Sequence, residues 1–261
     1  MTGSIISRFK RSLRTYTQSA LDLLYPPRCA SCVTRLGSPA PADFCPSCEE
    51  LLEPVFPPAC EICSEPFPGK IPRAFACPNC AGQTFAFDCA ISVWHCSGPL
   101  REAIHRFKYA RSIHLRLPLA RKLFDTLSDP RVAQSTDPDD PDSIPDWLLV
   151  PVPLHSRRLR ERRFNQSAEL ARTLSKLSGL PCRDVLRRTR YTTAQAALSR
   201  KERLKNLAGA FSFKSGSALP AHGNILLIDD VFTTGSTAHE CATVLKKAGA
   251  KRIIVLTVAR G

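Results

Sequence analysis

The clearest pattern of apolar and polar positions lies near the end of the sequence, where a short apolar run meets two carboxylates. Residues 225–228 are all apolar, which is typical of a strand buried on both faces of a parallel sheet. The run ends at Asp229 and Asp230, and small hydroxyl-bearing residues follow around a glycine at 233–237. Residues 238–248 then show the apolar period of a helix. The predicted order is strand, acidic pair (Asp229 and Asp230), glycine loop (residues 233–237) and helix.

The same patterns predict the other elements of an α/β domain. Strands are expected at 89–94, 147–153 and 251–259, and helices at 99–109, 118–127 and 167–177. Residues 128–146 contain six aspartates, four prolines and one arginine, a composition typical of a solvated, irregular loop. Strands that alternate with helices indicate a parallel sheet flanked by helices.

The glycine loop has the features of a phosphate site. A loop that joins a strand to a helix offers free backbone N–H groups and the positive end of a helix dipole. It is not a P-loop, because the sequence has no G-x-x-x-x-G-K-[ST] motif. Carboxylates beside a phosphate would repel it, so the acidic pair is expected to face sugar hydroxyls or a magnesium ion. The candidate phosphate-binding residues are Thr233, Thr234, Gly235, Ser236 and Thr237.

Residues 225–237 resemble the loop that binds phosphoribosyl pyrophosphate (PRPP) in type I phosphoribosyltransferases, a hydrophobic strand followed by D-D-x-x-x-T-G-x-T. The resemblance implies that Asp229 and Asp230, the catalytic pair, hold the ribose 2- and 3-hydroxyls. It also implies that the glycine loop holds the 5-phosphate and that Mg²⁺ binds with PRPP. The alternative is a chance strand–loop–helix unit with an acidic pair at the surface.

A second strand end leads into the basic segment, residues 154–166, which reads L-H-S-R-R-L-R-E-R-R-F-N-Q. A basic loop between a strand and a helix predicts a second anion site on the same edge of the sheet. In type I transferases the corresponding loop binds pyrophosphate, and some of the arginines here are expected to be plain surface charges. The resemblance implies a pyrophosphate loop that includes Leu154, His155, Arg157 and Arg158.

Eight of the 12 cysteines form four C-x-x-C pairs at near-equal spacing. Each pair can supply two ligands to a tetrahedral zinc ion, and two pairs complete a site without an open position, so two structural Zn²⁺ ions are predicted. Disulfides are the competing interpretation, and they require an oxidising compartment. The predicted ligands are Cys29, Cys32, Cys45 and Cys48 for one ion, and Cys60, Cys63, Cys77 and Cys80 for the other.

Length and charge set the remaining expectations for the 261 residues. The formal net charge is +14, and residues 155–205 carry 15 Lys and Arg against 4 Asp and Glu, which favours a polyanionic partner over a merely solvated surface. Residues 1–24 read as a short amphipathic helix rather than a secretory signal, and no apolar run spans a bilayer, so a cytoplasmic protein is expected. The expected domains are 25–84, a double zinc ribbon, and 85–261, with an acidic flexible loop at 129–146.

Residues 187–211 are polar and basic and lie between core strands. This composition suits a lid over a phosphate ester, and a plain crossover connection fits it nearly as well.

The whole chain resembles the ComF family of competence-associated proteins, in which a double zinc ribbon precedes a phosphoribosyltransferase-type domain. The resemblance begins near residue 23 and also rests on F-K-Y at 107–109, V-P-V-P at 150–153 and F-N-Q at 164–166. Arg163 is a departure, because the family usually has glycine there, and glycine permits a positive φ.

The resemblance implies a PRPP-binding protein associated with DNA uptake, in one of two classes. In the first, the protein is a transferase that passes the ribosyl group of PRPP to an acceptor. In the second, the fold serves only for binding, and the zinc ribbons and basic face engage single-stranded DNA or a competence helicase. The sequence leaves the acceptor, the turnover and the oligomeric state open.

Overall fold

The computed structural model describes residues 26–37, 43–69, 71, 75–133, 146–192 and 206–261. The predicted helix at 1–24, most of the acidic loop and the centre of the predicted lid lie outside these residues. The chain divides into two compact units, residues 1–51 and 52–261, and this division falls inside the predicted zinc-ribbon domain. Among the described helices, none is both long and apolar enough to cross a membrane.

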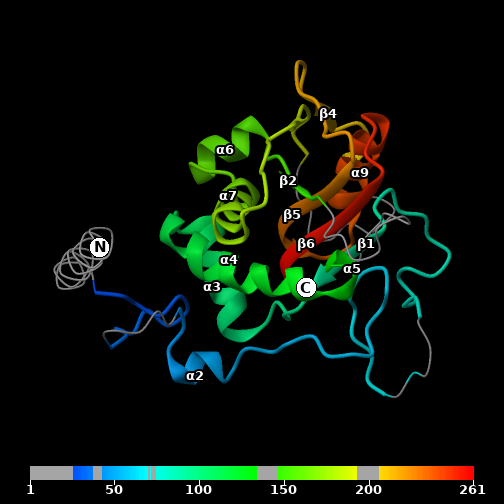
Figure 1. Cartoon of the computed structure of the whole chain (residues 1–261). Helices are drawn as coiled ribbons and strands as arrows, with labels where there is room; N and C mark the ends of the chain where they lie inside the picture. The colour runs from blue at the N-terminus through cyan, green and yellow to red at the C-terminus, as the bar shows by residue number, and fades with distance from the viewer. Residues whose placement is uncertain (1–25, 38–42, 70, 72–74, 134–145, 193–205) are drawn as a thin grey trace, which may run out of the picture. The chain divides into compact units, whose positions relative to one another are not determined.

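A four-stranded parallel sheet forms the centre of the larger unit, as the sequence predicts (Figure 1). Its strands are β1 (Cys89–Ser92), β2 (Leu148–Pro151), β5 (Asn224–Phe232) and β6 (Arg252–Arg260), in the order β1-β6-β5-β2. The apolar runs that predicted β2 and β5 pair with each other, with Val150 opposite Leu227. Because both faces of these strands are covered, their apolar side chains are buried.

Helices cover both faces of this sheet (Figure 1). On one face lie α3 (Gly98–Tyr109), α4 (Arg116–Phe124) and α7 (Gln166–Ser178), with short 3-10 turns at Ile113–Leu115 and Asp125–Ser128. On the other lie α9 (Ser236–Lys247) and an antiparallel hairpin of β3 (Leu186–Arg188) and β4 (Phe211–Phe213). The smaller unit contains one short helix, α2 (Pro46–Glu49), in its described part.

Three elements differ from the sequence predictions in extent or type. The predicted helix at 118–127 starts two residues earlier and ends as a 3-10 turn. The acidic loop begins with a short helix, α5 (Pro130–Ala133), whose Val132 is buried and whose Arg131 forms an ion pair of 2.8 Å with Asp129. The predicted lid is flanked by β3 and β4, which are too short to show an alternating pattern.

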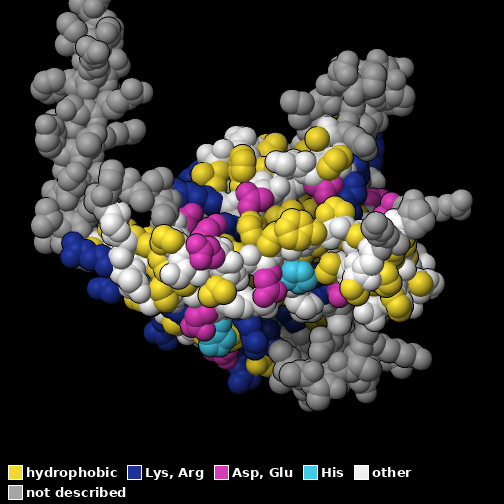
Figure 2. All heavy atoms as spheres, turned by 90° about the horizontal axis from the view of Figure 1, so that it is seen from below, with side chains coloured by type: hydrophobic (Ala, Val, Ile, Leu, Met, Phe, Trp, Pro, Cys, Tyr) yellow, Lys and Arg dark blue, Asp and Glu magenta, His cyan; other side chains and the backbone are white. Residues whose placement is uncertain are grey.

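Acidic, basic and apolar side chains are mixed on the face shown in Figure 2. The positive charge therefore does not form one continuous patch on the described part of that face. The dense run of basic residues belongs instead to α6 (Ser156–Arg162) and its neighbours, which follow β2.

Candidate functional site

The acidic pair lies at the carboxyl end of β5, but the strand does not stop before it. The sequence prediction ended the strand at residue 228, which is wrong, because β5 continues to Phe232 and pairs along its length with β6. Asp229 lies opposite Thr257, and Phe232 lies opposite Arg260. The two carboxylates have different partners, which come from α7 for Asp229 and from α3 for Asp230.

Asp229 is held by α7 and by its own strand. The Ser167 hydroxyl donates to Asp229 Oδ1 at 2.8 Å, and the Asp230 backbone N–H donates to the same oxygen at 2.9 Å. Burial raises the pKa of Asp229 to about 6, the charge of Asp230 adds to this, and the Ser167 hydrogen bond works against it. A half-buried carboxylate in this position is ionised at neutral pH and has acceptor capacity left for a ligand.

Asp230 is paired with a lysine that the sequence analysis did not place in the site. Lys108 of α3 brings its Nζ to 2.8 Å from Asp230 Oδ1, and both side chains are largely buried. Burial lowers the pKa of Lys108, but the charge of Asp230 and the hydrogen bond to it outweigh this, so the pKa is raised. The only signal in the sequence is its place in the F-K-Y motif of the resemblance, since it is one of many charged residues on that helix.

The glycine loop turns directly from β5 into α9. Gly235 has a φ of +74° and precedes Ser236, the first residue of the helix. A Cβ at this position would lie 2.8 Å from the Phe232 ring, so the turn needs glycine for both its conformation and its space. The Thr234 and Ser236 hydroxyls are 3.0 Å apart, beside the N-terminal end of the helix. All five predicted phosphate-binding residues therefore fall on this corner, at the positive end of the α9 dipole.

The basic segment is mainly helical, which corrects the prediction of a loop. His155 caps α6 by accepting from the Arg157 backbone N–H at 3.2 Å, and α6 continues to Arg162 without a buried residue. Arg163 then adopts a φ of +74° and its N–H donates to the Leu159 carbonyl at 2.8 Å. An arginine thus holds the left-handed conformation that glycine would favour.

The start of the predicted lid packs on this helix. The Tyr191 ring lies edge-on to His155 at 5.3 Å, and the Arg157 guanidinium lies 4.7 Å from the centre of the same ring. Arg158 donates to the Thr192 carbonyl at 3.4 Å. His155, Arg157 and Arg158 are therefore brought together with residues 191–192.

Arg188 of β3 is a further basic residue that the sequence analysis did not single out. It is half-buried and donates to the Thr192 hydroxyl, while its Nε has no hydrogen-bond partner among the described residues. Burial lowers its pKa, and so does the nearby charge of Arg158. A half-buried, incompletely bonded guanidinium beside other arginines is suited to an anionic ligand.

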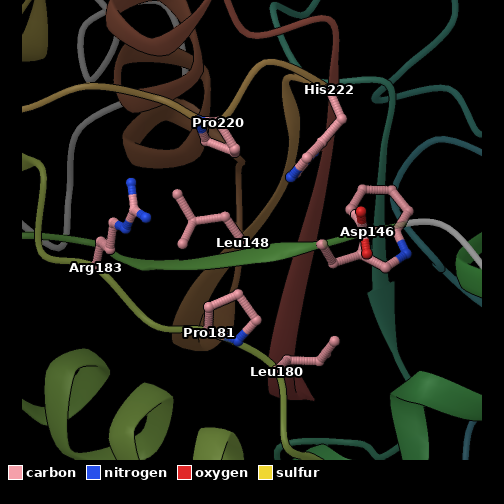
Figure 3. A pocket seen from close by; sticks show the side chains of 8 residues that line it. Asp146, Leu148, Leu180, Pro181, Arg183, Pro220 and His222 are labelled. Atoms are coloured by element: carbon pink, nitrogen blue, oxygen red, sulfur yellow. The ribbon is translucent and has the colours of Figure 1, made fainter.

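Two hollows differ in position and charge. The larger, about 450 Å³, opens between α6, the start of α7 and the hairpin, and its cations are Arg163, Arg172, Arg187, Arg188 and Lys214. The smaller, about 270 Å³, lies at the opposite end of β2 and is lined by Leu148, Leu180, Pro181, Arg183, Pro220 and His222, among others (Figure 3). Only the larger hollow shares an edge of the sheet with the acidic pair.

The acidic pair and the basic segment share this edge because β2 and β5 are neighbours. Asn165 links them, since its side chain caps α7 at the Ser167 N–H and also donates to the Val152 carbonyl at 3.0 Å. Ser167, two residues after Asn165, donates a hydrogen bond from its hydroxyl to Asp229. The carboxyl ends of β2 and β5 thus bring carboxylates, hydroxyls and arginines to the same edge of the sheet.

Each predicted set of four cysteines comes together. The first tetrad (Cys29, Cys32, Cys45 and Cys48) and the second tetrad (Cys60, Cys63, Cys77 and Cys80) each keep all ligand atoms within 4.8 Å of one another. The Sγ atoms of Cys63 and Cys77 are 3.6 Å apart, close to the roughly 3.8 Å that tetrahedral Zn–S bonds of about 2.3 Å require. Both tetrads fit structural zinc.

Comparisons with known proteins agree with this architecture. A family model described as "Double zinc ribbon domain" matches residues 20–81, and one described as "Phosphoribosyl transferase domain" matches residues 165–261. Among solved structures, one titled "Structure of the allosteric regulatory enzyme of purine biosynthesis" superposes with a TM-score of 0.34 and 19% identity. That match covers 57% of this chain and 26% of the other.

Three curated relatives cover most of both chains. Competence protein F of Haemophilus influenzae is 32% identical over 185 residues, 70% of this chain and 78% of that protein. DNA utilization protein YhgH of Escherichia coli K12 is 34% identical over 188 residues, 70% and 77% of the two chains. Competence protein ComFC of Streptococcus pneumoniae is 28% identical over 198 residues, 70% and 80% of the two chains. The identity of 32–34% over more than two thirds of the first two relatives, together with the two matched domain families, shows that the chain belongs to the ComF family.

Proposed function

We propose that this protein binds PRPP with Mg²⁺ at the carboxyl edge of its sheet and serves DNA uptake. The observation that carries the proposal is the acidic pair, with Asp229 held by Ser167 and Asp230 held by Lys108, separated from the glycine loop by two residues. Two oriented carboxylates and a helix N-terminus suit a ligand that has neighbouring hydroxyls at one point and a phosphate at another.

Each part of PRPP has a counterpart in the site. The carboxylates of Asp229 and Asp230 would accept hydrogen bonds from the ribose 2- and 3-hydroxyls, and the hydroxyls and N–H groups of residues 233–237 would hold the 5-phosphate. His155, Arg157 and Arg158 would face the pyrophosphate. Mg²⁺ prefers oxygen ligands and is usually held by substrate phosphates and one or two carboxylates, so the acidic pair also fits this ion.

The transferase class needs only positioning and charge stabilisation from these residues. When the bond between C1 and the pyrophosphate breaks, negative charge gathers on the leaving group, where arginines stabilise it. Mg²⁺, when bound, neutralises part of the same charge. The ribosyl carbon becomes electron-poor, and the ionised acidic pair lies at the end of the sugar that carries its hydroxyls. An acceptor with a nucleophilic atom would complete the transfer.

The binding class is favoured by a different observation, the charge of the larger hollow. Two of its cations are paired, Arg172 with Glu169 at 2.7 Å and Lys214 with Asp184 at 2.9 Å, while Arg163, Arg187 and Arg188 have no acidic partner among the described residues. A basic groove of this kind suits the phosphates of single-stranded DNA. The names of the relatives, competence protein and DNA utilization protein, support a role in DNA uptake. In the binding class, single-stranded DNA or a competence helicase would be the partner.

Calorimetric titration of the full chain with PRPP and Mg²⁺ tests the proposal. Ribose 5-phosphate and pyrophosphate, titrated separately, are the matched controls, because each contains one half of the ligand. We expect PRPP to bind more tightly than either half, and PRPP binding no tighter than pyrophosphate alone would contradict the assignment. Pyrophosphate release in the presence of candidate acceptors then separates the transferase class from the binding class.

A further inference from the structure

The two cysteine tetrads differ in their surroundings. In the first tetrad, within the unit of residues 1–51, Cys32 is exposed and Cys45 is half-buried. In the second tetrad, within the unit of residues 52–261, all four cysteines are buried. The second tetrad belongs to the same hydrophobic cluster as residues of β2, β5 and α9. It is therefore part of the core of the sheet domain.

The first half of the second tetrad is attached to the outer strand of the sheet. The Ala90 N–H of β1 donates to the Ile62 carbonyl at 2.8 Å, and the Ser64 hydroxyl donates to the Ala90 carbonyl at 2.8 Å. Glu65 forms an ion pair with Arg260 of β6. The turn between Cys60 and Cys63 thus covers an edge that would otherwise lack partners.

The chain that follows Cys77 and Cys80 forms the floor of the glycine loop. Phe85 stacks on Phe87 at 4.7 Å between ring centres, and Phe87 meets Phe232 edge-on at 6.0 Å. A Cβ on Gly235 would lie 2.8 Å from the Phe232 ring and 3.5 Å from the Phe85 ring. The loop backbone therefore rests directly on these rings.

A hydrogen bond joins the same segment to α9. The Ala86 N–H donates to His239 Nδ1 at 3.2 Å, and the Phe85 ring lies edge-on to His239 at 6.2 Å. His239 is one helical turn from Gly235, whose carbonyl accepts from the His239 N–H at 2.8 Å. Residues 85–87 therefore contact the glycine loop in two ways, through the rings packed beneath Gly235 and through the hydrogen bond to His239 of α9.

The described part of residues 60–88 contains only turns, bends and isolated bridges, with no helix or strand. A segment of this kind depends on its metal for order, because zinc binding and folding are coupled in small zinc modules. The carboxylates Asp229 and Asp230 are held from other elements, by α7 and α3. Loss of the second zinc should therefore loosen the glycine loop and leave the acidic pair in place.

We infer that zinc at the second tetrad positions the glycine loop through Phe85 and Phe87, whereas zinc at the first tetrad has no part in the ligand site. This inference rests on the proposed function in so far as PRPP affinity is its readout. Cys77 and Phe85 are positioning residues in this account, because they act on a ligand only through Gly235 and its neighbours.

Matched serine variants of the full chain test the inference. Cys77→Ser and Cys45→Ser should each lose about one of two zinc ions by elemental analysis. We expect Cys77→Ser to weaken PRPP binding by about tenfold or more, because small misplacements of binding groups have large effects. Cys45→Ser should disturb the smaller unit and leave PRPP affinity unchanged. Equal affinities in the two variants, whether both retained or both lost, would overturn the inference.

Phe85→Ala keeps every zinc ligand and tests the route directly. We expect two zinc ions per chain, faster hydrogen exchange at the amides of residues 233–239 and a weaker PRPP affinity. Phe67→Ala is the control, because it removes a partly exposed ring of the same segment. It should leave both the hydrogen exchange of residues 233–239 and the PRPP affinity unchanged. Unchanged exchange in Phe85→Ala and Cys77→Ser would reject the coupling even if PRPP proved not to be the ligand. Absence of PRPP binding in the unmodified protein, with the exchange difference present, would reject only the proposed function.

Discussion

The two segments at the ligand edge of the sheet differ in how firmly the fold holds them. The acidic pair and glycine loop are set by hydrogen bonds, an ion pair and a close backbone approach to Phe232. The basic segment is carried by α6, which has no buried residue and whose Arg157–Glu161 ion pair is exposed. The acidic pair and glycine loop, which are the fixed half of the site, can select the shape of a sugar phosphate. The basic segment, which is the exposed half, supplies positive side chains that can adjust to the ligand.

The largest effect should come from removing the charge of Asp229. Its pKa in the folded protein is about 6, above the ordinary value of 3.8 for an aspartate side chain, so the folded state binds this proton more tightly than the unfolded state. The ionised form therefore opposes folding at neutral pH. At about 1.4 kcal/mol for each pKa unit, Asp229→Asn should stabilise the fold by up to about 3 kcal/mol.

The sign of this effect fixes its pH window. The advantage of Asp229→Asn should be complete above pH 6, decrease as the pH falls and vanish below the unfolded pKa near 4. Denaturant unfolding of both proteins across this range measures it. A variant that is less stable than the unmodified protein at pH 7 would show that the fixed half of the site is not strained by its charge.

The close approach at Gly235 should give the next largest effect. Gly235→Ala introduces both a left-handed alanine and a clash with Phe232, for a loss of about 2 kcal/mol in unfolding free energy. Gly179→Ala is the matched control, because Gly179 has a φ of +79° with nothing within 4 Å of an added Cβ. Thermal unfolding should show Gly235→Ala as the more destabilised, and equal losses would mean that the loop yields to the added methyl group.

The basic segment should respond through charge and not through stability. Replacing Arg157, Arg158 and Arg160 with alanine should weaken the salt dependence of single-stranded DNA binding. The slope of log K against log salt concentration should become shallower by about 2, because each lost phosphate contact removes roughly 0.7. The same variant should lose PRPP affinity if the segment faces pyrophosphate, and at low salt the two ligands should compete. Fluorescence titrations at several salt concentrations measure both.

A control variant makes the charge change elsewhere. Lys176, Arg183 and Lys247 are exposed and follow or end helices at the opposite edge of the sheet, so their replacement should leave both titrations unchanged. Equal effects of the two triple variants would indicate a response to net charge alone.

The smallest effect concerns Arg163. Its left-handed conformation costs a non-glycine residue about 1 kcal/mol, so Arg163→Gly should stabilise the protein by about that amount. Arg163→Ala removes the same charge and keeps the strain, and it should show no gain in denaturant unfolding. A gain in both variants would assign the effect to the charge.

These differences also explain what the sequence could predict. The acidic pair, the glycine loop and both tetrads could be picked out because each has a local signature in the sequence, either an apolar run or a fixed spacing. The structure places the acidic pair at the end of a buried strand and brings the four cysteines of each tetrad together. The helix α6 was missed because none of its residues is buried, so it has no apolar period to read. Lys108 and Arg188 were missed because their roles depend on contacts between elements distant in the sequence.

The most direct test of the central claim is calorimetric titration of Asp229→Asn/Asp230→Asn with PRPP and Mg²⁺. Each carboxylate should contribute a charge-assisted hydrogen bond of about 1.5–3 kcal/mol to the ribose hydroxyls. We therefore predict at least a tenfold loss of PRPP affinity in a folded protein, with pyrophosphate binding retained. Unchanged PRPP affinity in the double variant would contradict the account, even if a phosphate still bound at the glycine loop.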